Sequence, residues 1–206
     1  MTTPGSHHGL LVVLCGPSGV GKSTISNRLQ EQYGFEYIVS ATTRPRREGD
    51  DKGKKYEYIS TDEFLRRLDA NDFLEYAQVY DYWYATPKKG AIVAMSAGRD
   101  VLLEIDVQGA LQVRFQHPEA LLLFILPPDE PTLLRRLESR ARESDEEIRR
   151  RFRAAKREIH MAKGSRAFDH MVINDDLDRA VREILTIINN RRAERLEAER
   201  EEQLED

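Results

Sequence analysis

A run of residues near the amino terminus has the composition of a phosphate-binding loop. Glycines alternate with small residues and lead into a lysine and a hydroxyl, in the order Gly16-Pro17-Ser18-Gly19-Val20-Gly21-Lys22-Ser23-Thr24. The glycines allow successive backbone N–H groups to converge on phosphate oxygens. Lys22 would give a positive charge to the β- and γ-phosphates, and the Ser23 hydroxyl would be a ligand for Mg²⁺. The run therefore predicts a nucleoside triphosphate site.

Such a loop has this meaning only when a strand enters it and a helix leaves it. The apolar residues 10–15 predict a buried strand, and residues 22–33 predict a helix that stops at Gly34. The alternative, a plain glycine turn capped by Ser23, leaves the match of both flanks unexplained. We expect this loop to be the centre around which the chain is organised.

Size and composition exclude several classes of protein. The chain has 206 residues, 33% charged and 40% hydrophobic, which suits one soluble α/β domain with insertions. The apolar runs at 10–15 and 120–126 are too short to span a bilayer, and no signal or transit peptide precedes the loop. The single cysteine predicts no internal disulfide and a cytoplasmic location, and the net charge of −4 argues against a dedicated nucleic-acid binder.

A basic, irregular segment follows the first helix and an expected strand at 35–40. It contains Ser40, then Thr42-Thr43-Arg44, then Arg47 and Tyr56. In this order and spacing the chain resembles the guanylate kinases, P-loop enzymes that transfer the γ-phosphoryl group of ATP to GMP. The family usually has proline before its second arginine, whereas here Pro45 follows the first, which leaves open whether Arg46 or Arg47 faces the ligand.

The resemblance implies a clamp for the phosphate of GMP. Arg44 and Arg47 would grip the dianion with bidentate forks while Tyr56 donates its hydroxyl, roles that their chemistry allows. Taken alone, two loop arginines are more often solubilising charges. The triphosphate loop earlier in the chain favours the clamp.

Residues 72–80 and 81–86 alternate like two paired strands, and they resemble the family's base-binding segment with Ala85 in place of a glycine. By that resemblance Glu75, Tyr84 and Thr86 reach the nucleotide. The Glu75 carboxylate would accept from the two donors of guanine while the Ser40 and Thr86 hydroxyls donate to O6. The alternatives are a surface Glu75 and a Thr86-Pro87 pair that caps a helix at 87–97.

Residues 100–109 read as a second buried strand that ends in acids. In a parallel sheet its carboxyl end would lie beside the phosphate loop. Asp106 would then orient the water shell of Mg²⁺ or the guanine amino group. Glu104, which replaces the family's first aspartate here, is left open.

The second half of the chain predicts a third central strand at 120–126, two helices that meet near 142–144, and a last strand and turn at 168–176. Ser60 with Glu63 and Ser144 with Glu147 have the spacing of capping boxes. The resemblance implies lid arginines at Arg136, Arg140 and Arg151 and places Asn174 near the adenine of ATP. By its chemistry alone, Asn174 would cap the helix expected from Leu177 to about Asn190.

These observations predict an α/β fold with a P-loop parallel sheet flanked by helices, a GMP-binding insert and a helical lid. The expected division is a mobile terminus at 1–9, a core at 10–39, 98–127 and 164–190, the insert at 40–97, the lid at 128–163, and a solvated helical or frayed tail at 191–206. The resemblance implies ATP, GMP or dGMP and Mg²⁺ as ligands. A kinase for AMP or UMP and a guanylate-kinase-like module that binds proteins are the alternatives; the latter usually lacks an intact P-loop.

Overall fold

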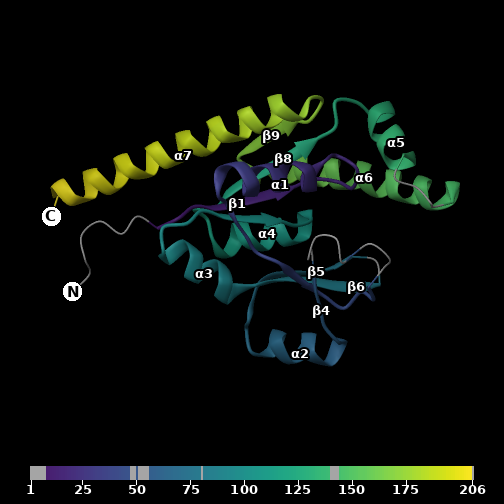
Figure 1. Ribbon diagram of the computed structural model, residues 1–206, viewed down its shortest axis with the longest axis horizontal. Coiled ribbons are helices and arrows are strands. Elements are labelled where there is room, and N and C mark those ends of the chain that lie inside the picture. The colour runs from purple at the N-terminus through teal and green to yellow at the C-terminus, as the bar shows by residue number, and fades with distance from the viewer. Residues whose placement is uncertain (1–7, 47–49, 51–55, 80, 140–143, 206) are drawn as a thin grey trace.

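The computed structural model describes residues 8–46, 50, 56–79, 81–139 and 144–205. Its centre is a parallel sheet with strand order β2-β7-β1-β8-β9 (Figure 1). The strands are β1 (Leu11–Cys15), β2 (Glu36–Tyr37), β7 (Val101–Glu104), β8 (Leu121–Leu126) and β9 (His170–Ile173). The expected buried strands at 10–15 and 120–126 are confirmed.

Helices cover both faces of this sheet. Successive side chains of a strand point to opposite sides, so each strand contributes to two separate packing layers. On β1, Val12 and Leu14 pack toward α1 (Lys22–Tyr33) and α7 (Leu177–Glu205), while Leu11 and Val13 pack toward α3 (Lys88–Ser96) and α4 (Val107–Gln116). The sheet is therefore the middle layer of an α/β fold, as the sequence predicts. No helix of the described residues has the length and apolar character needed to span a membrane.

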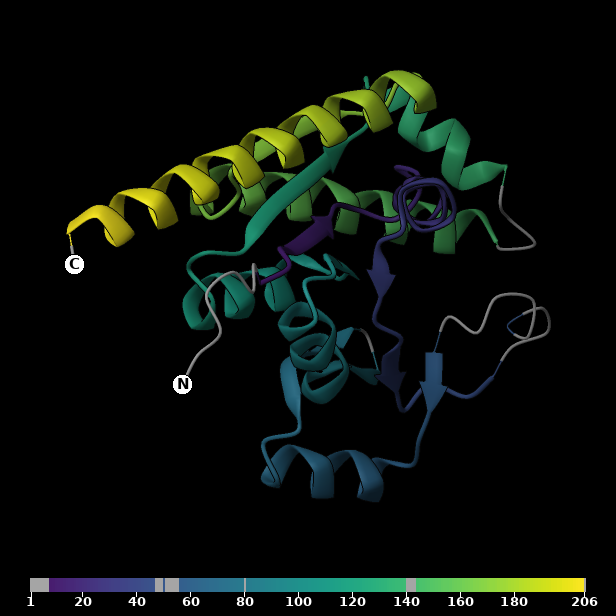
Figure 2. The same cartoon turned by 60° about the vertical axis from the view of Figure 1, so that its left-hand side comes forward.

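A second, smaller sheet has the order β4-β3-β6-β5. Its strands are β3 (Ser40–Thr42), β4 (Tyr56–Tyr58), β5 (Phe73–Val79) and β6 (Tyr82–Pro87), with α2 (Thr61–Asp69) packed below them through Phe64. Figures 1 and 2 show this sheet and α2 at the end of the molecule away from α7. The expected pairing of 72–80 with 81–86 is confirmed by the antiparallel ladder of β5 and β6.

The prediction of a single strand at 35–40 is wrong. The chain leaves the large sheet after Tyr37 and joins the small sheet at Ser40, so one extended segment serves two sheets. Alternation of side chains has the same period in both strands and carries no mark of the change of sheet.

A side chain of α4 helps to join the small sheet to the core. Gln112 of α4 accepts a hydrogen bond from Tyr76 N at 3.2 Å and donates one to Tyr76 O at 2.5 Å. Tyr76 lies on β5, which is an edge strand of the small sheet. The amide thus takes the position that a neighbouring strand would take.

Three helices complete the fold: α5 (Glu130–Glu138), α6 (Asp145–Ser165) and α7. The capping box at Ser144 and Glu147 is confirmed, whereas at Ser60 only half of the box forms, since the Glu63 carboxylate pairs with Arg66 instead. Helix α7 runs past the expected end near Asn190 to Glu205, which settles the tail as a helical extension.

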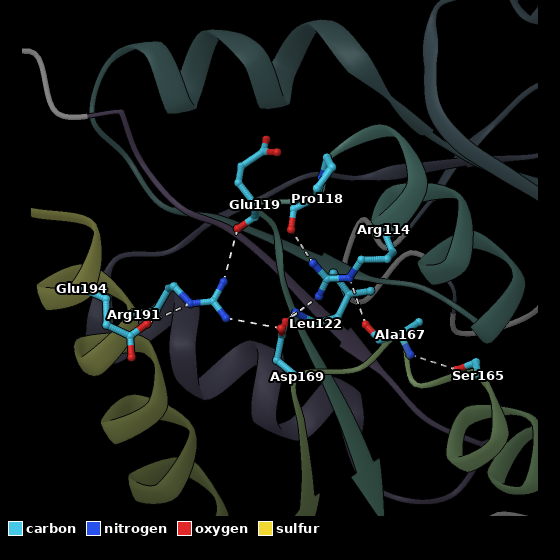
Figure 3. A network of polar contacts seen from close by, with 9 residues as sticks. All are labelled: Arg114, Pro118, Glu119, Leu122, Ser165, Ala167, Asp169, Arg191 and Glu194. Atoms are coloured by element: carbon cyan, nitrogen blue, oxygen red, sulfur yellow. Dashed lines mark hydrogen bonds and ion pairs between the residues drawn. The ribbon is translucent and has the colours of Figure 1, made fainter. Parts of the chain in front are cut away.

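Asp169, at the end of the sheet away from the phosphate loop, ties α4 and α7 to β8 (Figure 3). Its carboxylate accepts from Arg114 at 2.6 Å, from Leu122 N at 2.8 Å and from Arg191 at 3.3 Å. Asp100 has a similar role, since it accepts from Leu10 N and from Arg192 of α7. The first part of the α7 extension is therefore fixed to the core by two carboxylates.

Candidate functional site

The loop at 16–24 joins β1 to α1, as predicted, and its glycines lie against other elements. Gly21 is the N-cap of α1 with a left-handed φ of 96°. A Cβ atom at Gly19 would lie 3.0 Å from Leu137 Cδ2 of α5, and one at Gly21 would lie 2.4 Å from Asn174 Nδ2. The left-handed backbone favours glycine at both positions, and at Gly21 the close approach of Asn174 favours it as well.

The lysine and serine of the loop have distinct partners. Lys22 Nζ donates to the carbonyl oxygens of Gly16 and Pro17. Ser23 Oγ donates to Glu104 Oε1 at 2.7 Å. The carboxylate that the sequence leaves open is thus in direct contact with the hydroxyl expected to bind Mg²⁺. Hydroxyl and carboxylate oxygens are the ligands that Mg²⁺ prefers.

Asp106, which the sequence analysis expects at the site, is the N-cap of α4. Its Oδ1 accepts from Gln108 N at 2.7 Å and Gly109 N at 3.0 Å, because α4 begins at Val107. The prediction of a strand over 100–109 is therefore wrong beyond Glu104, where β7 ends. Burial raises the pKa of Asp106, while the two backbone donors and the charge of Lys22 oppose that shift.

Arg44 is nearly buried, with 8% of its surface exposed. Its guanidinium donates to Pro45 O at 2.9 Å, Asp50 Oδ2 at 3.0 Å and Tyr58 Oη at 3.3 Å. The rings of Tyr56 and Tyr58 lie 5.7 and 5.6 Å from its central carbon. The sequence did not single out Tyr58, although its alternation with Tyr56 on one strand was a usable signal. Arg47 lies outside the described residues.

Tyr56 and Tyr84 form an edge-to-face pair with ring centroids 5.6 Å apart. Ser40, on β3, is the register partner of Tyr56 on β4. Burial and the neighbouring Tyr84 and Glu104 raise the pKa of Tyr56 to about 12, so its hydroxyl remains a donor at neutral pH. Glu104 therefore lies near Tyr56 of the small sheet and also accepts a hydrogen bond from Ser23 of the phosphate loop.

Glu75 and Thr86 form a buried pair on β5 and β6. Thr86 Oγ1 donates to Glu75 Oε1 at 2.6 Å, and the N-cap of α3 is Pro87 rather than Thr86. Burial raises the pKa of Glu75 to about 7, the Thr86 hydroxyl opposes the rise, and the charge of Asp106 adds to it. Glu75 also lies against the start of α4, since a Cβ at Gly109 would be 2.1 Å from its Oε2.

Two of the expected lid arginines contact the phosphate loop. Arg136 of α5 donates to Val20 O at 3.5 Å, and Arg151 of α6 donates to Ser18 Oγ at 2.5 Å. Arg140 lies outside the described residues. Sequence reasoning did not single out Glu158 of α6, a carboxyl near Lys22 and Asp106: burial raises its pKa to about 7, with Lys22 opposing and Asp106 adding to the rise. Its place two helical turns after Arg151 on α6 was the available signal.

Asn174 follows β9 and is buried. Its Nδ2 donates to Val20 O at 2.7 Å. The first turn of α7 is closed by Asp176 instead, which accepts from Arg179 N at 2.8 Å.

The parallel sheet, the P-loop after its central strand, and the arginines and tyrosines gathered around it define a P-loop kinase of the α/β class. The family model for guanylate kinase matches residues 8–191. The chain belongs to the guanylate kinase family, whose reaction is the transfer of the γ-phosphoryl group of ATP to GMP. It is thus a nucleoside monophosphate kinase.

Relatives and solved structures agree with this assignment. The chain is 45% identical to a guanylate kinase of Caldanaerobacter subterraneus subsp. tengcongensis, over 87% of this chain and 86% of the relative. It is 43% identical to one of Clostridium tetani, over 88% and 86%. The crystal structure of guanylate kinase from Anaplasma phagocytophilum has a TM-score of 0.73 at 30% identity and covers 90% of this chain and 87% of that one.

Proposed function

We propose that this chain uses ATP and Mg²⁺ to phosphorylate GMP and dGMP in cytoplasmic purine nucleotide metabolism, with the residues of 40–97 binding the acceptor and those of 128–163 forming the lid. The observation that carries the choice of acceptor is the buried Glu75–Thr86 pair beside Asp106. A carboxylate at this place accepts from N1–H and the amino group of guanine, and the Ser40 hydroxyl donates to O6. The Thr86 hydroxyl, which donates its one proton to Glu75 Oε1 in this structure, would turn from the carboxylate to O6 when guanine binds. Adenine has an acceptor at N1 and would leave the carboxylate unpaired.

The phosphate of the acceptor binds Arg44, Arg47, Tyr56 and Tyr84. Arg44 supports this role because its fork already holds a carboxylate oxygen of Asp50 at 3.0 Å, the kind of planar anion that a phosphate resembles in its paired oxygens. The tyrosine rings around the guanidinium shield it from water, which strengthens its interaction with an anion. A GMP phosphate would take the place of Asp50 on this fork.

The triphosphate of ATP binds the loop at 16–24, with Lys22 on the β- and γ-phosphates. The oxygen donors of Ser23 and Glu104 fit Mg²⁺, with Asp106 reaching it through water. When bound, the cation neutralises charge on the β- and γ-phosphates. Removal of the cation with EDTA should abolish turnover, and added Mg²⁺ should restore it.

The reaction requires little proton transfer, since the attacking oxygen belongs to a phosphate that is already ionised at neutral pH. The difficulty is to hold two polyanions in line. Lys22 and Arg44 neutralise them from the core and the small sheet, and Arg136, Arg140 and Arg151 do so from the lid. Such groups lower the barrier by binding the charge of the transferring phosphoryl group more strongly than that of the substrates.

The proposal is tested by measuring ADP release with ATP and a panel of acceptors. GMP and dGMP should be phosphorylated, while AMP and UMP should react about 5- to 150-fold less well, as a buried mismatch of about 1–3 kcal/mol requires. Equal rates with AMP would contradict the role of Glu75. No turnover with any acceptor would favour a module that binds partners instead.

A further inference from the structure

We infer that Asn174 is a positioning residue that holds the phosphate loop in its binding conformation through the carbonyl of Val20. The inference rests on the proposed function, since it assigns a new part of the ATP site. It differs from a contact with the adenine ring, the role that the resemblance gives to this residue.

The first observation is the hydrogen bond itself. Asn174 Nδ2 lies 2.7 Å from Val20 O, and the asparagine keeps only 6% of its surface exposed. The side chain of Val20 is fully buried. A buried carbonyl at this place needs a donor, and the nearby Thr24 and Ile25 N–H groups already bond to Gly21 O.

The second observation is the fit between Asn174 and Gly21. A Cβ atom at Gly21 would lie 2.4 Å from Asn174 Nδ2, so the amide fills the space that a side chain would occupy. Gly21 has a left-handed φ of 96° and directly precedes Lys22, the first residue of α1. Contact with the amide therefore fixes the turn that aims the lysine and the first N–H groups of the helix.

The third observation is that Asn174 is itself rigidly held. Its backbone N–H donates to Leu126 O at the end of β8, at 2.9 Å, and it directly follows β9. The Asn174 side chain is thus held in place by β8 and β9, and from there it supports the loop.

Arg136 contacts the same carbonyl of Val20 as Asn174. Its Nη1 reaches the same Val20 carbonyl from α5 at 3.5 Å, a long and weak hydrogen bond. Because Asn174 makes the shorter bond, the carbonyl stays paired when Arg136 turns toward the phosphates. The asparagine therefore keeps the loop in place while the lid arginine moves.

The test uses ligands that separate the phosphates from the base. Asn174→Asp keeps the shape but loses the donor, and Asn174→Ala removes both without adding charge. Calorimetry in the presence of Mg²⁺ should show that both variants bind inorganic tripolyphosphate and ATP more weakly than the wild type does. The two affinities should fall by the same factor, about tenfold or about 1.4 kcal/mol. GMP affinity should stay within about twofold, and the P-loop amides should exchange hydrogen faster. The exposed Asn190→Ala on α7 is the matched control and should bind all three ligands like the wild type.

Two results would overturn the inference. One is unchanged tripolyphosphate affinity with weakened ATP, which would place the asparagine on the base. The other is normal binding of both ligands by Asn174→Ala. If Asn174→Asp does not fold, Asn174→Ala decides the matter alone. A wild-type protein that binds tripolyphosphate but does not phosphorylate GMP would refute the proposed function and leave this inference standing.

Discussion

Thr86 Oγ1 and Glu75 Oε1 lie 2.6 Å apart, and both residues are buried on neighbouring strands of the small sheet. This bond holds the carboxylate in one orientation and leaves its second oxygen at the start of α4, next to Gly109. The pair therefore presents a carboxylate acceptor in a fixed orientation, close to the charge of Asp106.

Glu75→Gln should reduce the preference for GMP over AMP. The amide offers one acceptor and one donor where guanine needs two acceptors, and such a buried mismatch costs about 1–3 kcal/mol. The ratio of kcat/KM for GMP to that for AMP should fall about 5- to 150-fold. Glu63→Gln, on α2 away from the site, is the control. An unchanged ratio would mean that another residue reads the base.

The same carboxyl makes stability depend on pH. Its pKa is raised from 4.5 to about 7 by burial, so between these values the folded state holds a proton that the unfolded chain has released. The stabilisation is complete below pH 4.5 and is lost as the pH rises through 7. The free energy of unfolding of wild type minus that of Glu75→Gln should fall by up to about 3 kcal/mol from pH 5 to 8. Glu158 is common to both proteins and cancels; a flat difference would exclude the shift.

Lys22→Ala should lose phosphoryl transfer and keep its fold. The ammonium group is partly buried and bonds to backbone carbonyls of its own loop, so its removal disturbs no core packing. A loss of at least about 10² in kcat is expected for one preorganised charge at the transferring group. Circular dichroism and thermal unfolding check the fold, and near-normal turnover would remove Lys22 from the site.

Arg44→Ala should raise the KM for GMP far more than the KM for ATP, because its guanidinium lies on the small sheet among Tyr56, Tyr58 and Asp50. Arg44→Lys is the matched variant: it keeps the charge but loses the bidentate fork, so it should recover only part of the affinity. Equal effects on both substrates would indicate a general loss of structure.

Asp169→Asn should destabilise the protein without changing the chemistry. The neutral amide weakens the pairs with Arg114 and Arg191 and the bond from Leu122 N, which join α4, α7 and β8 (Figure 3). We expect a loss of about 1–3 kcal/mol in urea unfolding and unchanged kcat per folded molecule. Glu194→Gln, at the exposed end of the same network, should stay within about 0.5 kcal/mol of wild type.

Local chemistry made much of the site predictable. The loop at 16–24, its flanking strand and helix, and the paired strands that carry Glu75 and Thr86 follow from composition and period alone. The exact bounds of the functional segments required tertiary contacts. Asp106 looked like the end of a strand because an N-cap residue and a strand end are both polar and both follow an apolar run. The change of sheet after Tyr37 has no mark in the local pattern. The parallel sheet predicted acids beside the phosphate loop, but it did not indicate which of them bonds to Ser23.

The hydrogen bonds between Gln112 and the backbone of Tyr76 have a consequence for solubility. An outer strand with open N–H and C=O groups invites another polypeptide to pair with it. The glutamine closes that position on β5 with a side chain, so a second molecule finds no template there. The edge of the small sheet is therefore less open at Tyr76 to pairing with another polypeptide.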